Sequence, residues 1–207
     1  LEECLLKSVR SLETGVCHFH VAKFDNMTDE EILSYLGGFQ DDNIYAVFEM
    51  LRRGASIVKL HDVTKITPLF LEAFKRIVDM EALVKNNIGD VAILKNAKVM
   101  GFGDEYISKV WNMPETDIYK TRKENGIMPI FKMVDTLHTG KYIAYLYSSY
   151  TGENESRLTD KRKIVVLGAG PIRIGQGVEF DYSTVHAVQT IKRNGYEAII
   201  INNNPET

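Results

Sequence analysis

Residues 163–182, KIVVLGAGPIRIGQGVEFDY, determine the fold expected for the C-terminal part of the chain. A strand is expected over residues 163–167, and it runs directly into a turn with glycines at positions 168, 170, 175 and 177. Helical spacing follows over about residues 183–193, Asn194-Gly195 ends it, and a second apolar run covers residues 198–201. A strand, a helix and a strand in this order predict one β-α-β unit with a parallel strand pair.

The glycine-rich turn does not fit a dinucleotide site. The dinucleotide fingerprint requires a small residue where Arg173 stands, and it requires an acid at the end of the second strand, where the sequence reads Asn202-Asn203-Asn204. Pro171 also removes one backbone N–H from the turn. A phosphate-binding P-loop is excluded because no Gly-Lys-Ser/Thr follows the glycines.

Two carboxylates follow the turn. We expect Asp181 to cap the helix that begins near Ser183. Glu179 has no such local task, and ligands of open α/β sheets bind at the carboxyl ends of the strands. Glu179 is therefore the better candidate for a functional residue.

Composition indicates an ordinary soluble protein. The 207 residues carry a net charge of −3, so no overall positive field would recruit nucleic acid or an anionic membrane. No apolar run reaches the roughly 18 residues of a membrane span, and no signal peptide opens the chain. Cys4 and Cys17 fit no metal or redox spacing, which favours a reducing, cytoplasmic location. Because the chain begins without Met and ends just behind a strand, we interpret it as part of a longer polypeptide.

Upstream of residue 126 the sequence predicts an array of helices with short loops. The strongest helix follows Thr67-Pro68, and its apolar stripe runs from Phe70 to Val84. Thr28 and Glu31 match a capping box, and Asp41 or Asp42 is expected to cap the next helix. The helices are expected over about residues 1–12, 29–36, 44–51, 68–84, 91–99, 104–111 and 115–124.

Beyond residue 126 the pattern changes to extended structure. Residues 129–135 and 142–147 are rich in aromatic and β-branched side chains, and residues 148–162 have the composition of a linker. His18 and His20 alternate in a way that could suggest a metal site, but no third ligand lies near them in sequence. We therefore expect a core or surface role for both.

These motifs resemble the carbamoyl phosphate synthase large subunit over essentially the whole chain. GPIRIGQGVEFDY and NNNPET are similar to the opening of its second synthetase half. LEECLLKSVRSLETG is similar to the end of its first ATP-grasp half. MPIFKMVDT and YLYSSYTGENE are similar to the end of its oligomerisation domain.

The resemblance implies a mainly α chain: a helical oligomerisation domain followed by the first β-α-β unit of a Rossmann-like (pre-ATP-grasp) α/β domain. Residues 1–14 would end the first ATP-grasp half, 15–156 would form the oligomerisation domain, and 157–207 would start the carbamoyl phosphate synthetic domain. The family makes carbamoyl phosphate from bicarbonate, ammonia and two ATP with Mg²⁺ or Mn²⁺. The ammonia comes from glutamine through a small amidotransferase subunit, and the product feeds arginine or pyrimidine biosynthesis.

The resemblance also implies a role for individual residues. It places Gly177, Glu179 and Glu206 in the wall of the tunnel through which carbamate passes between the two halves. It assigns no catalytic, metal or cofactor residue to this segment, and the segment alone is expected to be inactive. Expected partners are the rest of the large subunit, the small subunit and further copies of the chain. The alternative is a free-standing helical interaction module with a Rossmann-like nucleotide-binding tail.

Overall fold

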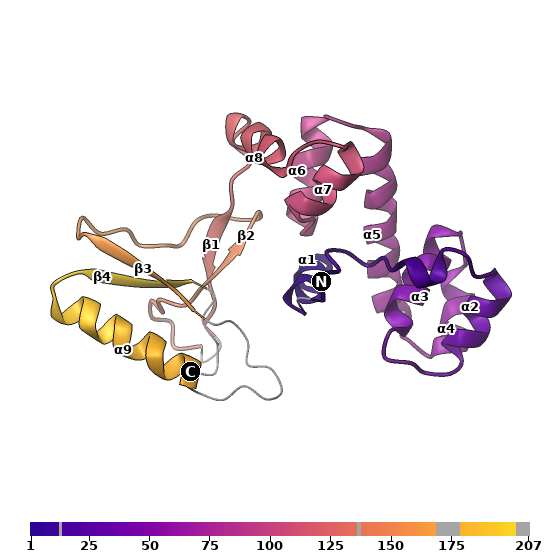
Figure 1. The fold of residues 1–207 in the computed structure, drawn as a ribbon, viewed down its shortest axis with the longest axis horizontal. Helices are drawn as coiled ribbons and strands as arrows, with labels where there is room; N and C mark the ends of the chain where they lie inside the picture. Colours follow the sequence, from indigo (N-terminus) through magenta and orange to yellow (C-terminus); the bar gives the residue numbers. More distant parts are fainter. Residues whose placement is uncertain (13, 136–137, 169–178, 202–207) are drawn as a thin grey trace. The chain divides into compact units, whose positions relative to one another are not determined.

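The computed structural model describes residues 1–12, 14–135, 138–168 and 179–201, which fall into two compact units, Leu1–Ser156 and Arg157–Thr207 (Figure 1). Unit 1 consists of helices and a short hairpin, and unit 2 contains one β-α-β motif. The predicted fold class is therefore confirmed. Within the described ranges, no helix combines the length and the apolar character that a bilayer crossing requires.

The long helix α5 (Pro68–Asn86) is the central element of unit 1 (Figure 1). Helices α3 and α4 pack against one part of α5, and helices α6 and α7 pack against another part of it. α1 contacts both α5 and α6. The remaining bounds are α1 Glu2–Ser11, α2 Asp29–Leu36, α3 Asn43–Arg52, α4 Ile57–Thr64, α6 Val91–Met100, α7 Asp104–Trp111 and α8 Glu115–Glu124.

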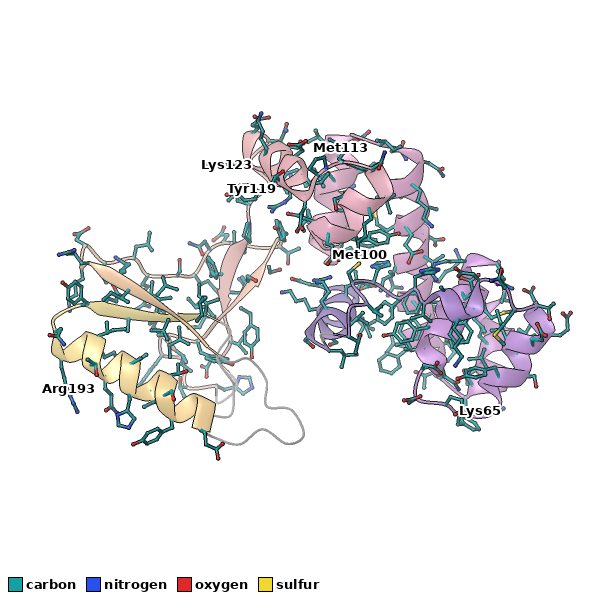
Figure 2. The ribbon with its side chains drawn as sticks, viewed as in Figure 1. Lys65, Met100, Met113, Tyr119, Lys123 and Arg193 are labelled. Atoms are coloured by element: carbon teal, nitrogen blue, oxygen red, sulfur yellow. The ribbon has the colours of Figure 1, made fainter. Side chains whose placement is uncertain are left out.

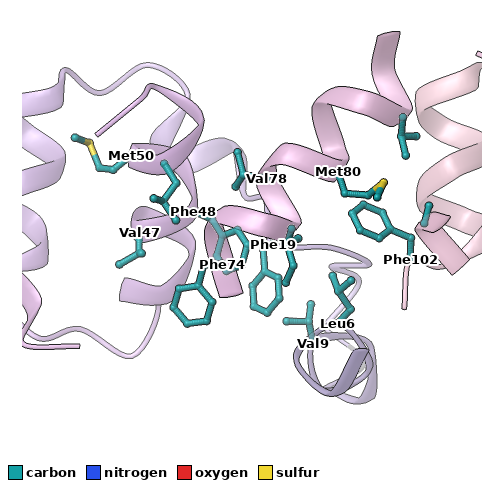
Figure 3. Close-up of a cluster of buried hydrophobic side chains, with 14 of the residues drawn as sticks. Leu6, Val9, Phe19, Val47, Phe48, Met50, Phe74, Val78, Met80 and Phe102 are labelled. Atoms are coloured by element: carbon teal, nitrogen blue, oxygen red, sulfur yellow. The ribbon is translucent and has the colours of Figure 1, made fainter. Parts of the chain in front are cut away.

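Stacked aromatic rings fill the core around α5 (Figure 3). Phe19, from the loop after α1, lies parallel to Phe48 of α3 with the ring centroids 4.1 Å apart. The ring centroid of Phe48 in turn lies 5.0 Å from that of Phe74 of α5. Leu6 and Val9 of α1 are buried in the same cluster. One hydrophobic core thus includes the first helix of the chain as well as the later ones.

The expected stripe of α5 is correct except at its start. Ala73, Phe74, Ile77 and Val84 are buried, but Phe70 is 43% exposed. Leu71, one position later, takes the buried place in the first turn.

The expected helix caps are confirmed at α2 and wrong at α3. Thr28 and Glu31 make both hydrogen bonds of the capping box. Asp42 occupies the N-cap position of α3, but its carboxylate accepts hydrogen bonds from Lys23 and Tyr35 instead of from the helix. A nearby ammonium and phenol thus outcompete the backbone N–H groups. Thr67 likewise occupies the N-cap of α5 without a side-chain cap bond.

The sequence pattern does not predict α4 (Ile57–Thr64). Ser56 caps it by accepting a hydrogen bond from the N–H of Lys59. The helix ends at Lys65, which is labelled in Figure 2 and has a left-handed backbone with φ of 59°. Its eight residues begin with two β-branched side chains, which lower helix propensity. Burial of Leu60 and Thr64 stabilises the helix where local propensity does not.

A two-stranded antiparallel hairpin, β1 (Ile130–Met133) and β2 (Leu146–Ser149), follows the helices. The chain after β2 then returns along the other edge of β1. There the N–H of Glu155 donates to the Phe131 carbonyl at 2.8 Å, and the Asn154 side chain accepts from the Phe131 N–H at 3.0 Å. The expectation of a featureless linker over 148–162 is therefore wrong for its first half.

Unit 2 has the predicted β-α-β order, with β3 (Lys163–Leu167) parallel to β4 (Glu197–Ile201) and α9 (Glu179–Arg193) between them. The helix begins at Glu179, earlier than expected. Asp181 is consequently the third residue of α9, so its prediction as the cap is wrong.

One face of the parallel pair carries exposed apolar side chains. Val165 lies opposite Ile199 and Leu167 lies opposite Ile201, and all four are between 38% and 78% exposed. Parallel sheets are normally covered on both faces, and two strands with one helix bury too little apolar surface to fold alone.

We therefore predict that residues 157–207, expressed by themselves, do not fold. Circular dichroism should show mostly coil, and heating should give no cooperative transition, because the described residues of unit 2 leave this face of β3 and β4 uncovered. A cooperative thermal transition in this fragment would contradict the prediction.

Candidate functional site

The structure describes only one of the residues predicted to line a tunnel. Glu179 is the first residue of α9 and its side chain is exposed. Gly177 and Glu206 lie outside the described residues, so their distances to Glu179 are not defined. The tunnel assignment stays a prediction.

The edge of the sheet at which these residues are expected is nevertheless partly described. The strands β3 and β4 are parallel, so their carboxyl ends lie side by side. The pairing continues one residue past β3, where the N–H of Gly168 donates to the carbonyl of Ile201 at 2.7 Å. This is the edge at which open α/β sheets bind ligands.

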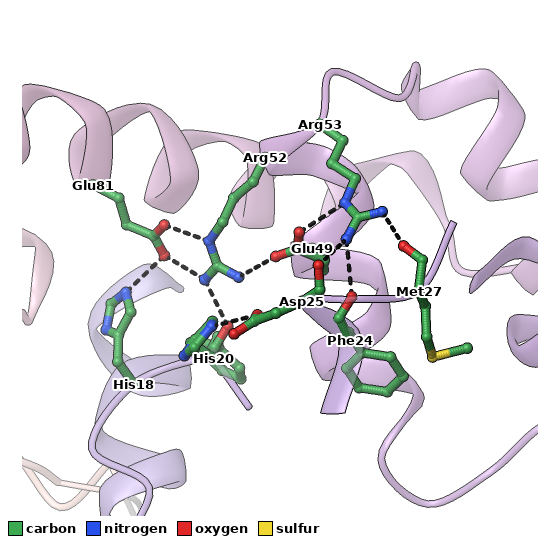
Figure 4. Close-up of polar contacts among 10 residues, drawn as sticks. His18, His20, Phe24, Asp25, Met27, Glu49, Arg52, Arg53 and Glu81 are labelled. Carbon is green, nitrogen blue, oxygen red and sulfur yellow. Dashed lines mark hydrogen bonds and ion pairs between the residues drawn. The ribbon is translucent and has the colours of Figure 1, made fainter. Parts of the chain in front are cut away.

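The best-formed polar site among the described residues is an ion-pair network in unit 1 (Figure 4). Glu81 of α5 is 2% exposed and accepts two parallel hydrogen bonds from Arg52 of α3, from Nε at 2.7 Å and from Nη2 at 2.8 Å. His18, which is 3% exposed, lies 2.8 Å from the same carboxylate through Nε2. A planar guanidinium paired with a carboxylate in this way is among the stronger ionic contacts in proteins.

The two arginines at the end of α3 also hold the loop that precedes α2. Arg52 donates to the carbonyl of Phe19 at 2.6 Å. Arg53 donates to the carbonyls of Met27 at 2.6 Å and Phe24 at 2.9 Å. A loop with little regular structure is thus fixed by charged donors bound to its backbone.

The sequence carries a signal for this network at the position of Glu81. Glu81 falls on the apolar stripe of α5, seven residues after Phe74 and three before Val84. A carboxylate on a buried stripe requires a buried cation. Arg52 stands four residues after the buried Phe48 and supplies that cation.

Burial and hydrogen bonding act in opposite directions on the pKa of Glu81. Burial raises it, but the bonds from Arg52 and His18 outweigh burial and hold the pKa at about 2. Burial lowers the pKa of His18 below its usual value, against the opposing effect of Glu81. Nδ1 of His18 is buried without a partner in the described part of the chain, so the neutral tautomer with a proton on Nε2 fits best.

A groove of about 820 Å³ lies beside the network and is lined in part by Cys17, Lys85 and Lys109. Lys109 pairs with Glu105 at 2.7 Å, and His20 pairs with Asp25 at 2.8 Å. The described residues contain no group of three or more His, Cys, Asp or Glu that could hold a metal ion. The network is therefore suited to holding helices together and offers no set of open ligands.

We predict that Glu81→Gln lowers the free energy of unfolding of unit 1 by on the order of 3 kcal/mol at pH 7. This is the free energy that corresponds to a shift of the Glu81 pKa from 4.5 to about 2. Urea unfolding followed by the fluorescence of Trp111 measures this, because Trp111 is the single tryptophan and is buried in unit 1.

Asp79→Asn is the matched control, since Asp79 lies on the same helix and pairs with Lys75 at the surface. Its effect should stay below about 1 kcal/mol. In the unchanged chain, the contribution of Glu81 should be complete above pH 4.5 and disappear as the pH falls towards 2. Equal effects of the two substitutions would argue against a special role for Glu81.

A second prediction concerns His18. In the unfolded chain, His18 takes up a proton near pH 6.5, whereas in the folded chain burial keeps its ring neutral to lower pH. The free energy of unfolding should therefore fall as the pH is lowered through 6.5. His18→Phe removes the titrating group and should reduce this slope between pH 7 and pH 5. The same slope in both proteins would show that His18 is not the group responsible.

Comparison with known families gives two matches in order along the chain. Residues 1–126 match the family model described as the oligomerisation domain of the carbamoyl-phosphate synthetase large chain. Residues 160–207 match the model of the carbamoyl phosphate synthase preATP-grasp domain. The first match alone covers more than half of the 207 residues.

Proposed function

The chain belongs to the carbamoyl-phosphate synthetase large-chain family, and on this premise we propose that the whole protein makes carbamoyl phosphate from bicarbonate, ammonia and two ATP. The observation that carries the proposal is the succession of two different domains of that one enzyme in a single chain. The experiment that tests it is an assay of the complete large chain for carbamoyl phosphate formed from bicarbonate, ATP and free ammonia. Absence of product from the complete, folded chain would contradict the proposal.

Within that enzyme, we assign unit 1 to oligomerisation and to the connection between two ATP-using halves. Residues 1–14 would lead in from the first half, 15–156 would form the oligomerisation domain, and 157–207 would begin the second half. The hydrophobic core supports a rigid role for unit 1, because Leu6 of α1 and Ile118 of α8 are both fully buried in it. Glutamine would reach the enzyme through a separate amidotransferase subunit.

The reaction of ATP is assigned to parts of the protein outside residues 1–207. The described residues contain no carboxylate cluster that fits Mg²⁺. Residues 1–207 alone should show no bicarbonate-dependent hydrolysis of ATP. Micromolar binding of NAD, FAD or ATP to this segment would favour a nucleotide-binding module instead.

Gly177, Glu179 and Glu206 remain the proposed wall of a carbamate tunnel. Glu179 supports this role because it is exposed at the start of α9, directly after the glycine-rich turn. A glycine leaves open the space that a side chain would fill, and carboxylates offer hydrogen-bond acceptors to a small polar intermediate.

We predict that Gly177→Phe in the complete enzyme uncouples the two halves. Hydrolysis of ATP should continue while the formation of carbamoyl phosphate falls, because the phenyl ring would obstruct the passage. Measuring ADP and carbamoyl phosphate in the same reaction gives the ratio directly. Gly177→Ala, a much smaller side chain, is the control and should keep most of the coupling, and normal coupling in Gly177→Phe would remove the tunnel role.

A further inference from the structure

The first helix of unit 1 and its second strand are hydrogen-bonded to one another, although about 140 residues separate them in sequence. Glu3 of α1 accepts a hydrogen bond from the hydroxyl of Ser149 at 3.0 Å. Lys7, one turn later, forms an ion pair with Glu3 at 2.8 Å and donates to the carbonyl of Ser148. The segment that enters unit 1 is thus joined directly to the segment that leads out of it.

Helix α1 is fixed in this place by close backbone packing. Gly101, at the C-terminal end of α6, has φ of 101°, and a Cβ atom there would lie 2.7 Å from the Cα of Glu3. Arg10 donates to the carbonyl of the same Gly101 at 3.0 Å. Because a side chain at this position would displace the helix, α1 has little freedom to slide.

The end of β2 is fixed at the same end of α6 by a different interaction. Lys98 and Arg122 are each 5% exposed and share the single carboxylate of Asp104, with Lys98 Nζ at 2.7 Å and Arg122 Nε at 2.9 Å. Tyr150 directly follows β2, and the centroid of its ring lies 5.0 Å from Lys98 Nζ and 5.6 Å from Arg122 Cζ. Two buried cations exceed one carboxylate by a unit charge, and the negative face of the ring offsets part of that excess.

We propose that these contacts act together as a positioning element, the α1–β2 contact, formed by Glu3, Lys7, Ser148, Ser149 and Tyr150. It holds the chain that enters unit 1 and the chain that leaves it in one arrangement, so that the two ATP-using halves work in step. This inference rests on the proposed function, because it concerns the coordination of those halves. The five residues act through the position of α1 and β2.

The test uses the complete large chain with ammonia as the nitrogen source. ADP and carbamoyl phosphate are measured together in Tyr150→Leu and in the double variant Glu3→Ala/Ser149→Ala. The ratio of ATP consumed to carbamoyl phosphate formed should rise about 5-fold, the lower end of typical coupling between sites, while bicarbonate-dependent hydrolysis of ATP continues. The single variant Tyr150→Phe keeps the aromatic face, so its ratio of ATP consumed to carbamoyl phosphate formed should equal that of the unmodified chain.

Lys132→Met is the matched control, because it breaks an exposed ion pair with Glu155 on the other edge of β1. It should leave the ratio unchanged. An unchanged ratio in Tyr150→Leu and in the double variant would overturn the proposal, and so would a parallel loss of ATP hydrolysis and product, which a purely structural role predicts.

Hydrogen exchange of the α1 amides provides a readout that does not depend on the reaction. Tyr150→Leu should accelerate exchange in residues 2–11, and Tyr150→Phe should not. If the unmodified chain makes no carbamoyl phosphate, the proposed function fails while this measurement still decides whether β2 holds α1. Unchanged exchange in Tyr150→Leu would overturn the α1–β2 contact as a positioning element.

Discussion

A buried carboxylate on the central helix determines how unit 1 is arranged. Glu81 is only 2% exposed, and an unpaired charge at a buried position would be strongly unfavourable. Arg52 and His18 compensate that charge and bring α3 and the loop after α1 to the face of α5. The aromatic stack of Phe19 and Phe48 forms beside the same contact. The positions of α1, α3 and α5 therefore depend on one ion pair together with the rings around it.

Two features of unit 1 agree with the connecting role proposed for it. Its buried charged side chains are paired with one another, as in the Glu81 network and around Asp104. Its first helix and its last strand meet at the C-terminal end of α6. Both features agree with the membership of the chain in the carbamoyl-phosphate synthetase large-chain family, whose oligomerisation-domain model matches residues 1–126 of this unit.

Regular patterns in the sequence predicted most of the fold. The long stripe of α5, the capping box at Thr28 and the β-α-β order of unit 2 each have strong local signals. Helix α4 was missed because tertiary burial stabilises it against weak local propensity. Asp42 was misassigned because a cation and a phenol brought close by folding bind its carboxylate. Such competition between partners distant in sequence is invisible to a pattern of spacing.

The candidate tunnel site was predicted through resemblance, whereas the residues of the turn only argued against a dinucleotide. Of the three predicted tunnel residues the structure describes Glu179 alone. The buried network could have been predicted from a charge on an apolar stripe, but its partners could not. The most direct test of the central role of the Glu81–Arg52 ion pair is a ¹³C NMR titration of the Glu81 carboxyl in the folded chain. We expect a midpoint at about 2. A midpoint near the ordinary value of 4.5 would show that the ion pair does not hold the structure together.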